Sequence, residues 1–183
     1  AVGDCLAGLR GLPVAEAALV REVVATIIGG QRLDLQRFAS AGALVPVALK
    51  NDAELEDYAW RVAGCVGEFW TKLGFLTMGV RFSSSDENEM IRLGVNYGKG
   101  LQLINILRDL PADLAQGRCY LPVENPADRE QLMACHRRWI ERADEWINDG
   151  FRYASLLTTR RLQVASVMPA MIARETLGLM KNA

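Results

Sequence analysis

Hydrophobic residues recur every three or four positions along most of the chain, which is the spacing of helices that bury one face. No stretch alternates hydrophobic and polar residues as a half-buried strand does, and residues 39–50 are expected to form a loop. The pattern therefore predicts an all-α fold, with helices over residues 13–28, from about 52 to 76, 89–110, 128–157 and 159–180.

Local signals set the expected ends of these helices. Gly29-Gly30 should end the first helix, and Asn51 or Asp52 can cap the second. Because proline lacks an N–H group and crowds the preceding turn, Pro111 and Pro169 should each kink a helix. Residues 83–88 form a polar loop that should end in a helix cap. The helix over residues 128–157 has an apolar stripe of Leu132, Cys135, Trp139, Ala143, Trp146, Gly150, Tyr153 and Leu157.

A row of polar residues follows one face of the helix predicted over residues 89–110 and continues beyond it. At steps of four, three, four and four, the row comprises Gly98, Gln102, Asn105, Asp109 and Asp113. Buried polar groups need partners, and aspartates one turn apart repel each other. A divalent cation would satisfy both needs, and ligands that offer only oxygen suit Mg²⁺.

The same spacing also fits a solvated helix edge, on which Arg108 and Arg118 neutralise the two aspartates. The two amides favour a binding site, since a solvated edge does not require them. Pro111 lies between Asp109 and Asp113, so the expected kink turns Asp113 partly off the shared face.

Composition narrows the class of protein. The formal net charge of −1 gives no basis for binding nucleic acid. The four cysteines form no C-x-x-C pair, and no P-loop or dinucleotide-binding motif is present. His136 is the only histidine, and no nucleophile motif accompanies it. Scattered cysteines are typical of reduced thiols, so we expect a cytoplasmic protein. No apolar run reaches the length of a membrane span, so none is expected.

Two blocks carry a resemblance to a known family. The run over residues 101–122, LQLINILRDLPADLAQGRCYLP, resembles the second aspartate-rich motif of the squalene/phytoene synthase family. The run over residues 58–67, YAWRVAGCVG, is similar to the family's Y-x-x-x-VAG-x-VG motif. The resemblance implies an isoprenoid-synthase-type helical bundle around a central cavity. Residues 1–183 would then be a single all-α domain, the C-terminal two-thirds of that fold without its N-terminal helices.

The resemblance also implies roles for the polar row. Asn105, Asp109 and Asp113 would hold Mg²⁺ on the diphosphate of a substrate. Gln102 and Arg108 would bind or orient the phosphate oxygens.

The second block has two interpretations. By the resemblance, Tyr58 is a catalytic-pocket tyrosine that steers a carbocation; otherwise it is an ordinary helix residue. The small residues Gly64 and Gly67 fit close helix packing, or the floor of a groove for an isoprenoid tail with apolar walls. Those walls would comprise Val62, Val66, Phe69, Trp70 and Leu73. Upstream, Asp34 is expected to be structural, paired with Arg37, with a ligand role as the alternative.

The implied reaction is the head-to-head condensation of two prenyl diphosphates. Farnesyl diphosphate, giving a presqualene diphosphate or squalene-type product, is favoured over geranylgeranyl diphosphate, the substrate of phytoene synthases. A squalene product would need a nicotinamide reductant such as NADPH, for which no motif is present. A hydrocarbon product leaves peripheral membrane contact open, and the sequence carries no signal for an oligomeric state.

Family members carry a first aspartate-rich motif in helices near their start, and the present chain has no candidate for it. We expect either a piece of a longer protein or a remnant. The alternative function is therefore a non-catalytic helical subunit that binds lipid diphosphates.

Overall fold

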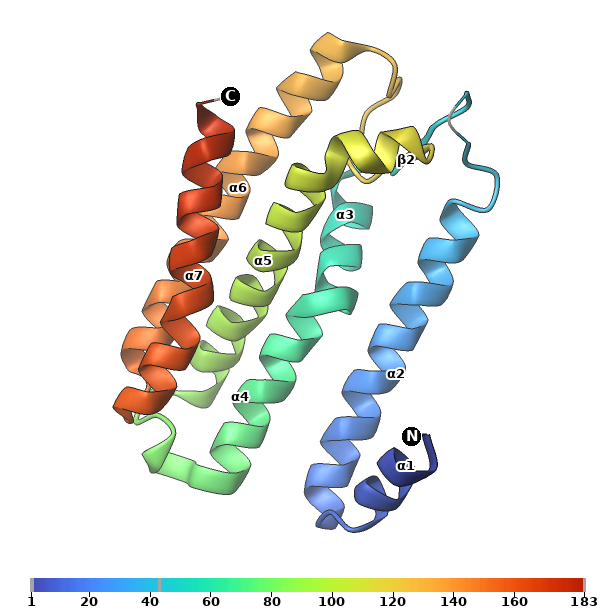
Figure 1. Ribbon diagram of the computed structural model, residues 1–183. Coiled ribbons are helices and arrows are strands. Elements are labelled where there is room, and N and C mark those ends of the chain that lie inside the picture. The colour runs from blue at the N-terminus through green and yellow to red at the C-terminus, as the bar shows by residue number, and fades with distance from the viewer. Residues whose placement is uncertain (1, 43, 183) are drawn as a thin grey trace.

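The computed structural model describes residues 2–42 and 44–182 and consists mainly of helices (Figure 1). The predicted all-α class is confirmed. The longer α-helices are α2 (Val14–Arg37), α4 (Cys65–Met78), α5 (Glu87–Ala115), α6 (Arg129–Leu156) and α7 (Arg160–Lys181). Shorter elements are α1 (Val2–Arg10), α3 (Asp52–Ala59), a π-helix (Trp60–Gly64), a 3₁₀ turn (Gly79–Arg81) and the strands β1 (Val47–Ala48) and β2 (Arg118–Cys119).

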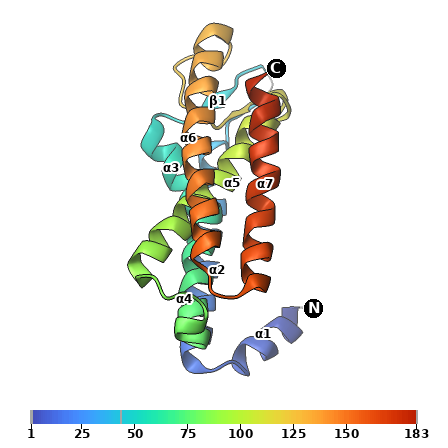
Figure 2. The ribbon, with the colours of Figure 1, turned by 90° about the vertical axis from the view of Figure 1, so that its left-hand side faces the viewer.

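Helix α5 is the centre of the bundle. It runs between α4 on one side and the α6–α7 pair on the other (Figure 1), and the pair lies side by side in the rotated view (Figure 2). Because it contacts both neighbours, its apolar residues are buried on more than one face. They include Met90, Leu93, Tyr97, Leu103, Ile104, Ile106, Leu107 and Leu110.

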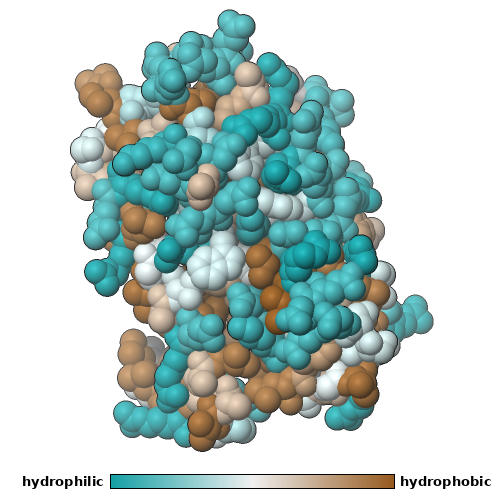
Figure 3. Space-filling model, turned by 180° about the vertical axis from the view of Figure 1, so that it is seen from behind, coloured by the Kyte–Doolittle hydropathy of each residue, from teal (hydrophilic) through white to brown (hydrophobic). Residues whose placement is uncertain are grey.

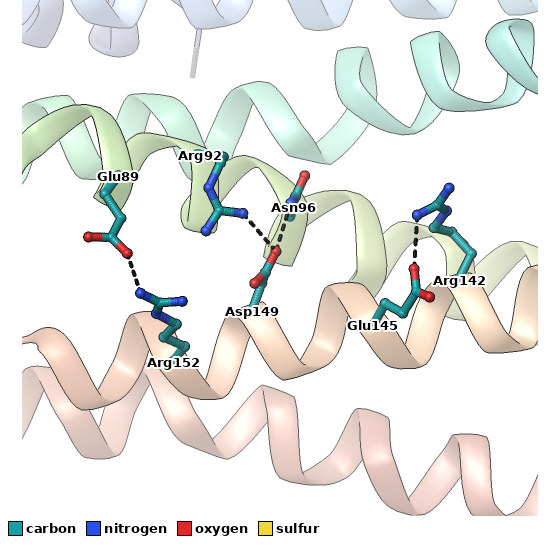
Figure 4. A network of polar contacts seen from close by, with 7 residues as sticks. All are labelled: Glu89, Arg92, Asn96, Arg142, Glu145, Asp149 and Arg152. Carbon is teal, nitrogen blue, oxygen red and sulfur yellow. Dashed lines mark hydrogen bonds and ion pairs between the residues drawn. The ribbon is translucent and has the colours of Figure 1, made fainter.

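The stripe predicted on α6 is confirmed, since all eight of its residues are buried. On the solvent side, polar contacts join α5 to α6 (Figure 4). Asp149 accepts hydrogen bonds from Asn96 at 2.7 Å and from Arg92 at 3.3 Å, and Arg152 pairs with Glu89. These contacts are exposed or half-buried, so each adds little stability and they mainly favour one alignment of the two helices.

The small residues of α4 and the π-helix let α5 approach at backbone distance. A Cβ atom built on Gly67 would lie 2.0 Å from the carbonyl oxygen of Gly94, and one on Gly98 would lie 2.3 Å from that of Ala63. No side chain fits at such distances. The close-packing interpretation of this patch is therefore confirmed.

The prediction that Gly29-Gly30 ends the first helix is wrong, because α2 continues to Arg37. Positive φ among the described glycines occurs at Gly79 and Gly117, so the pair in α2 keeps helical geometry. Gly30 is buried against Arg61, and a Cβ there would lie 2.9 Å from that residue's own Cβ. Gly30 thus allows α2 to pack closely on the π-helix, and it does not end α2.

The loop expected over residues 39–50 contains a strand that the sequence did not predict. Strand β1 pairs in parallel with β2, the Val47 N–H donating to Gly117 at 2.8 Å and the Leu49 N–H to Cys119 at 3.1 Å. Gly117 turns the chain into β2 with a φ of 81°. Two-residue strands show no alternation, which is why the pattern missed them.

Helix α5 also extends past its predicted end at Leu110 and reaches Ala115 with Pro111 inside it. In Figure 1 its yellow end bends away from the axis of the preceding turns, as expected of a proline within a helix. The caps predicted at Asn51 and in the loop before α5 are present, where Asn51 accepts from Glu54 N–H and Asp86 from Glu89 N–H.

Seen from behind, hydrophilic residues dominate the upper half of the surface, and hydrophobic residues gather toward the lower end (Figure 3). The turns that follow α1 and α4 lie at the lower end of Figure 1, and their exposed apolar side chains include Leu12 and Val80. Within the described ranges, no helix combines the length and the hydrophobicity needed to cross a bilayer.

The contact between Gly67 and Gly94 can be tested by adding one methyl group. We expect Gly67→Ala to destabilise the protein by about 3 kcal/mol, because two backbones must separate. The thermal midpoint should fall by roughly 9 °C. The control is Gly178→Ala in α7, where an added Cβ meets nothing within 4 Å and should raise stability by about 0.5 kcal/mol. Equal thermal midpoints for the two variants would contradict the backbone contact between Gly67 and Gly94.

Candidate active site

The polar row of α5 extends from Gln102, which is half-buried, through Asn105, which is exposed, to Asp109 and Asp113. Arg108 donates two hydrogen bonds to Asp109, at 2.8 and 2.9 Å. These bonds lower the pKa of the Asp109 carboxyl. The Asp109 side chain remains 47% exposed, so the pair is open to exchange with solvent or with an incoming anion.

Asp113 lies deeper than Asp109. Burial raises the pKa of its carboxyl, and the neighbouring charges of Asp109 and Asp34 raise it further, while Arg118 opposes them. Carboxylates from α2 and from the end of α5 therefore influence one another, with one arginine beside them. This crowding of negative charge favours binding of a cation.

Tyr120 connects Asp34 to Tyr58. The Tyr120 hydroxyl donates to Asp34 Oδ2 at 3.1 Å, and the Tyr120 ring stacks on Tyr58 with centroids 4.8 Å apart. Burial is the main cause that raises the pKa of both phenols and of Asp34. At neutral pH both tyrosines are therefore neutral and can donate hydrogen bonds.

Asp34 was interpreted from the sequence as a structural partner of Arg37. Arg37 lies near enough to lower the pKa of Asp34, but its ion pair is with Asp57, at 3.9 Å. The hydrogen bond of Asp34 goes to Tyr120, and its Oδ1 atom is buried without a partner among the described residues. Asp34 thus lies in the same cluster as Asp113. A ligand role is the alternative interpretation of Asp34 from the sequence, and its neighbours in the cluster come from residues far along the chain.

An apolar hollow lies next to the polar row. It measures about 270 Å³ and lies between the π-helix, α4, α5, α6 and α7. Its lining residues are Val62, Ala63, Val66, Gly67, Trp70, Gly94, Tyr97, Gly98, Leu101, Tyr153 and Ser166. Gly64 does not line it and instead contacts Lys99 and Trp60. Phe69 and Leu73, two of the expected walls, line other hollows of the molecule.

A second hollow, of about 420 Å³, lies between α5 and α7. Asn105 and Arg108 line it together with apolar residues that include Ile104, Met168 and Ile172. Leu101 lines both hollows, so the two adjoin at this side chain. Together they are called the trough here, with a mostly apolar end and an end that carries an amide and a guanidinium. Such a surface can accept a molecule with a hydrocarbon part and an anionic head.

The oxygen groups present fit a hard cation. Asp109, Asp113 and Asn105 offer carboxylate and carbonyl oxygens, and the buried Oδ1 of Asp34 needs a partner. Within the described ranges, no three His, Cys, Asp or Glu side chains converge into a ready-made cage. Mg²⁺ needs no such cage, because it is usually held by one or two carboxylates together with substrate phosphates and water.

Comparison with known proteins agrees with this geometry. The pattern that describes the squalene/phytoene synthase family matches residues 5–183. A presqualene diphosphate synthase from Zymomonas mobilis is 34% identical over 147 residues, which are 72% of this chain and 45% of that protein. A bifunctional lycopene cyclase/phytoene synthase from Arthroderma gypseum is 30% identical over 141 residues, which are 69% of this chain and 23% of that protein.

The fold has a counterpart among solved structures. Squalene synthase HpnC from Alicyclobacillus acidocaldarius matches 97% of this chain with a TM-score of 0.65 and 22% identity. The alignment covers 62% of that protein, so the chain spans less than two-thirds of each of these three proteins. Because the family pattern extends over nearly all of its residues, the chain belongs to the squalene/phytoene synthase family.

Proposed function

We propose that the protein containing this chain catalyses the Mg²⁺-dependent head-to-head condensation of two prenyl diphosphates, with release of diphosphate. Farnesyl diphosphate is the favoured substrate, and the product is of the presqualene diphosphate or squalene type. The observation that carries the proposal is the trough between the π-helix, α5 and α7, where Asn105 and Arg108 lie beside apolar residues. Asp109 and Asp113 follow on the same helix and line neither hollow. A prenyl diphosphate combines the two chemistries that this arrangement can bind.

In this proposal Asn105, Asp109 and Asp113 hold Mg²⁺ on the diphosphate, and Gln102 and Arg108 bind or orient the phosphate oxygens. The bound Mg²⁺ supplies charge neutralisation for the leaving diphosphate. Arg108 already presents two N–H groups to a carboxylate, and the same fork geometry suits a phosphate. Its 54% exposed side chain is free to make that exchange.

The trough accounts for the hydrocarbon part of the substrate. Val62, Val66 and Gly67 line its apolar end, where a prenyl tail and an allylic cation would be kept from water. Gly64 supports this wall through packing, since it faces Lys99 and Trp60. Tyr58 stacks on Tyr120 near Asp113 and would orient the cationic step as a neutral phenol. A squalene product requires NADPH as a further reactant.

The relatives named above include both presqualene diphosphate and phytoene synthases, so geranylgeranyl diphosphate is the alternative substrate. Incubating the full-length gene product with each prenyl diphosphate and extracting the hydrocarbon distinguishes a thirty-carbon from a forty-carbon product. Binding of either substrate without release of diphosphate would instead favour a non-catalytic lipid-diphosphate binder.

Diphosphate release provides the direct test of the carboxylates. In the full-length gene product with Mg²⁺ and farnesyl diphosphate, Asp109→Asn and Asp113→Asn should each lower the rate by about 100-fold or more. The physical reason is that an amide holds a cation far less well than a carboxylate. Rates are measured by a coupled diphosphate assay across a range of Mg²⁺ concentrations.

The matched control is Glu145→Gln, which makes the same carboxylate-to-amide change at an exposed site on α6 (Figure 4). Its rate should stay within twofold of the unmodified protein. Release of diphosphate that survives both aspartate substitutions would remove these residues from the proposed site.

The raised pKa of Asp113 leads to a separate expectation for stability. A carboxyl whose pKa is higher in the folded state binds its proton more tightly there. Its contribution to stability therefore falls as pH rises from its ordinary value of about 4 through the raised value. Without Mg²⁺, Asp113→Asn should melt about 1–2 °C higher than the unmodified protein at pH 7.5, a small rise because the side chain is half-buried.

The difference in melting temperature between Asp113→Asn and the unmodified protein should shrink as the pH is lowered toward 4. Asp109→Asn is the matched comparison. Arg108 lowers the pKa of the Asp109 carboxyl, so replacing this carboxylate should not raise the melting temperature. Thermal unfolding in the presence of a chelator measures the melting temperatures of both variants. An Asp113→Asn protein that melts below the unmodified one at pH 7.5 would show that this carboxylate serves the fold instead.

A further inference from the structure

Pro111 leaves a gap in the hydrogen bonding of α5. In an α-helix each N–H donates to the carbonyl four residues earlier, and proline has no N–H to donate. Pro111 lies inside α5, so the carbonyl of Leu107 receives no bond from position 111. Leu107 is buried, with 2% of its surface exposed, so a further partner for its carbonyl reduces the cost of losing that bond.

His136 supplies that partner from α6. Its Nε2 atom lies 3.2 Å from the Leu107 carbonyl oxygen. A carbonyl only accepts hydrogen bonds, so Nε2 must carry the proton. The side chain is half-buried, and it is the only histidine of the sequence.

The location of this bond connects it to the candidate site. Leu107 precedes Asp109 by two residues, and Pro111 stands between Asp109 and Asp113. The bond therefore ties α6 to α5 at the point where α5 bends (Figure 1). The last turns of α5 lead directly to Asp113 and onward to β2.

We propose that His136 is a positioning residue: its Nε2–H replaces the donor that Pro111 lacks, and so fixes the bend that sets Asp109 and Asp113 relative to each other. The proposal rests on the proposed function for the roles of these two aspartates. The hydrogen bond itself is independent of any reaction. His136 is not assigned a role in proton transfer.

The test compares two substitutions of similar shape, one with a donor and one without. His136→Gln can place an amide N–H near the position of Nε2, whereas His136→Met cannot donate. Each is made in the full-length gene product and again together with Pro111→Ala, which restores a backbone N–H at position 111. Arg137→Ala, an exposed neighbour on α6, controls for altered surface charge.

Thermal unfolding measures the bond without reference to activity. With Pro111 present, the Gln variant should melt about 3 °C above the Met variant. In the Pro111→Ala background the difference should fall below about 1 °C, because the backbone then serves the Leu107 carbonyl. The proposed role of the His136 bond would be overturned if the Gln and Met variants differed in melting temperature by the same amount in both backgrounds. It would also be overturned if they melted at the same temperature with Pro111 present.

Kinetics measures positioning. The Mg²⁺ concentration for half-maximal diphosphate release should rise about fivefold in His136→Met and stay within about twofold in His136→Gln, with the pH profile unchanged in both. A Met variant with normal Mg²⁺ response but lowered melting point would show a structural bond only, and would overturn the positioning role. If the unmodified protein releases no diphosphate, the proposed function fails, and the melting comparison still decides whether the bond exists.

Discussion

The backbone contact between α4 and α5 is the constraint on which the rest of the arrangement depends. Where Gly67 meets Gly94 and Gly98 meets Ala63, the helices touch through carbonyl groups and not through side chains. Helices that approach so closely can keep little freedom to rotate or slide past each other. The contact also fixes the position of α5, which carries the polar row, and the same small residues line the apolar end of the trough.

Charge near the end of α5 is distributed unevenly. Asp109 is largely exposed and satisfied by Arg108, whereas Asp113 and Asp34 are half-buried, and burial raises the pKa of both carboxyls. Burying carboxylates near one another costs stability, and a protein keeps such an arrangement more readily where a cation or a catalytic step requires it. Tyr120 and Arg118 reduce this cost without removing it.

Much of the architecture could be predicted from the sequence, because helical periodicity and caps are local signals. The stripe of α6 and the cap at Asn51 are examples. What the sequence could not indicate depends on tertiary contacts. Gly30 continues a helix because Arg61 covers it, and the π-helix has no periodic signature. Asp34 joins the site through Tyr120, which follows it by 86 positions.

The two-residue pairing of β1 with β2 has a kinetic consequence. Val47 and Arg118 are separated by about 70 residues of chain, whereas neighbouring helices such as α6 and α7 meet through short turns. Contacts between nearby segments form sooner during folding than those that close long loops. We therefore expect Val47 to pair with Arg118, close to Tyr120, later than α6 packs on α7. The cluster of Asp34, Asp113 and Tyr120 would then be completed late in folding, when the few main-chain bonds between β1 and β2 form.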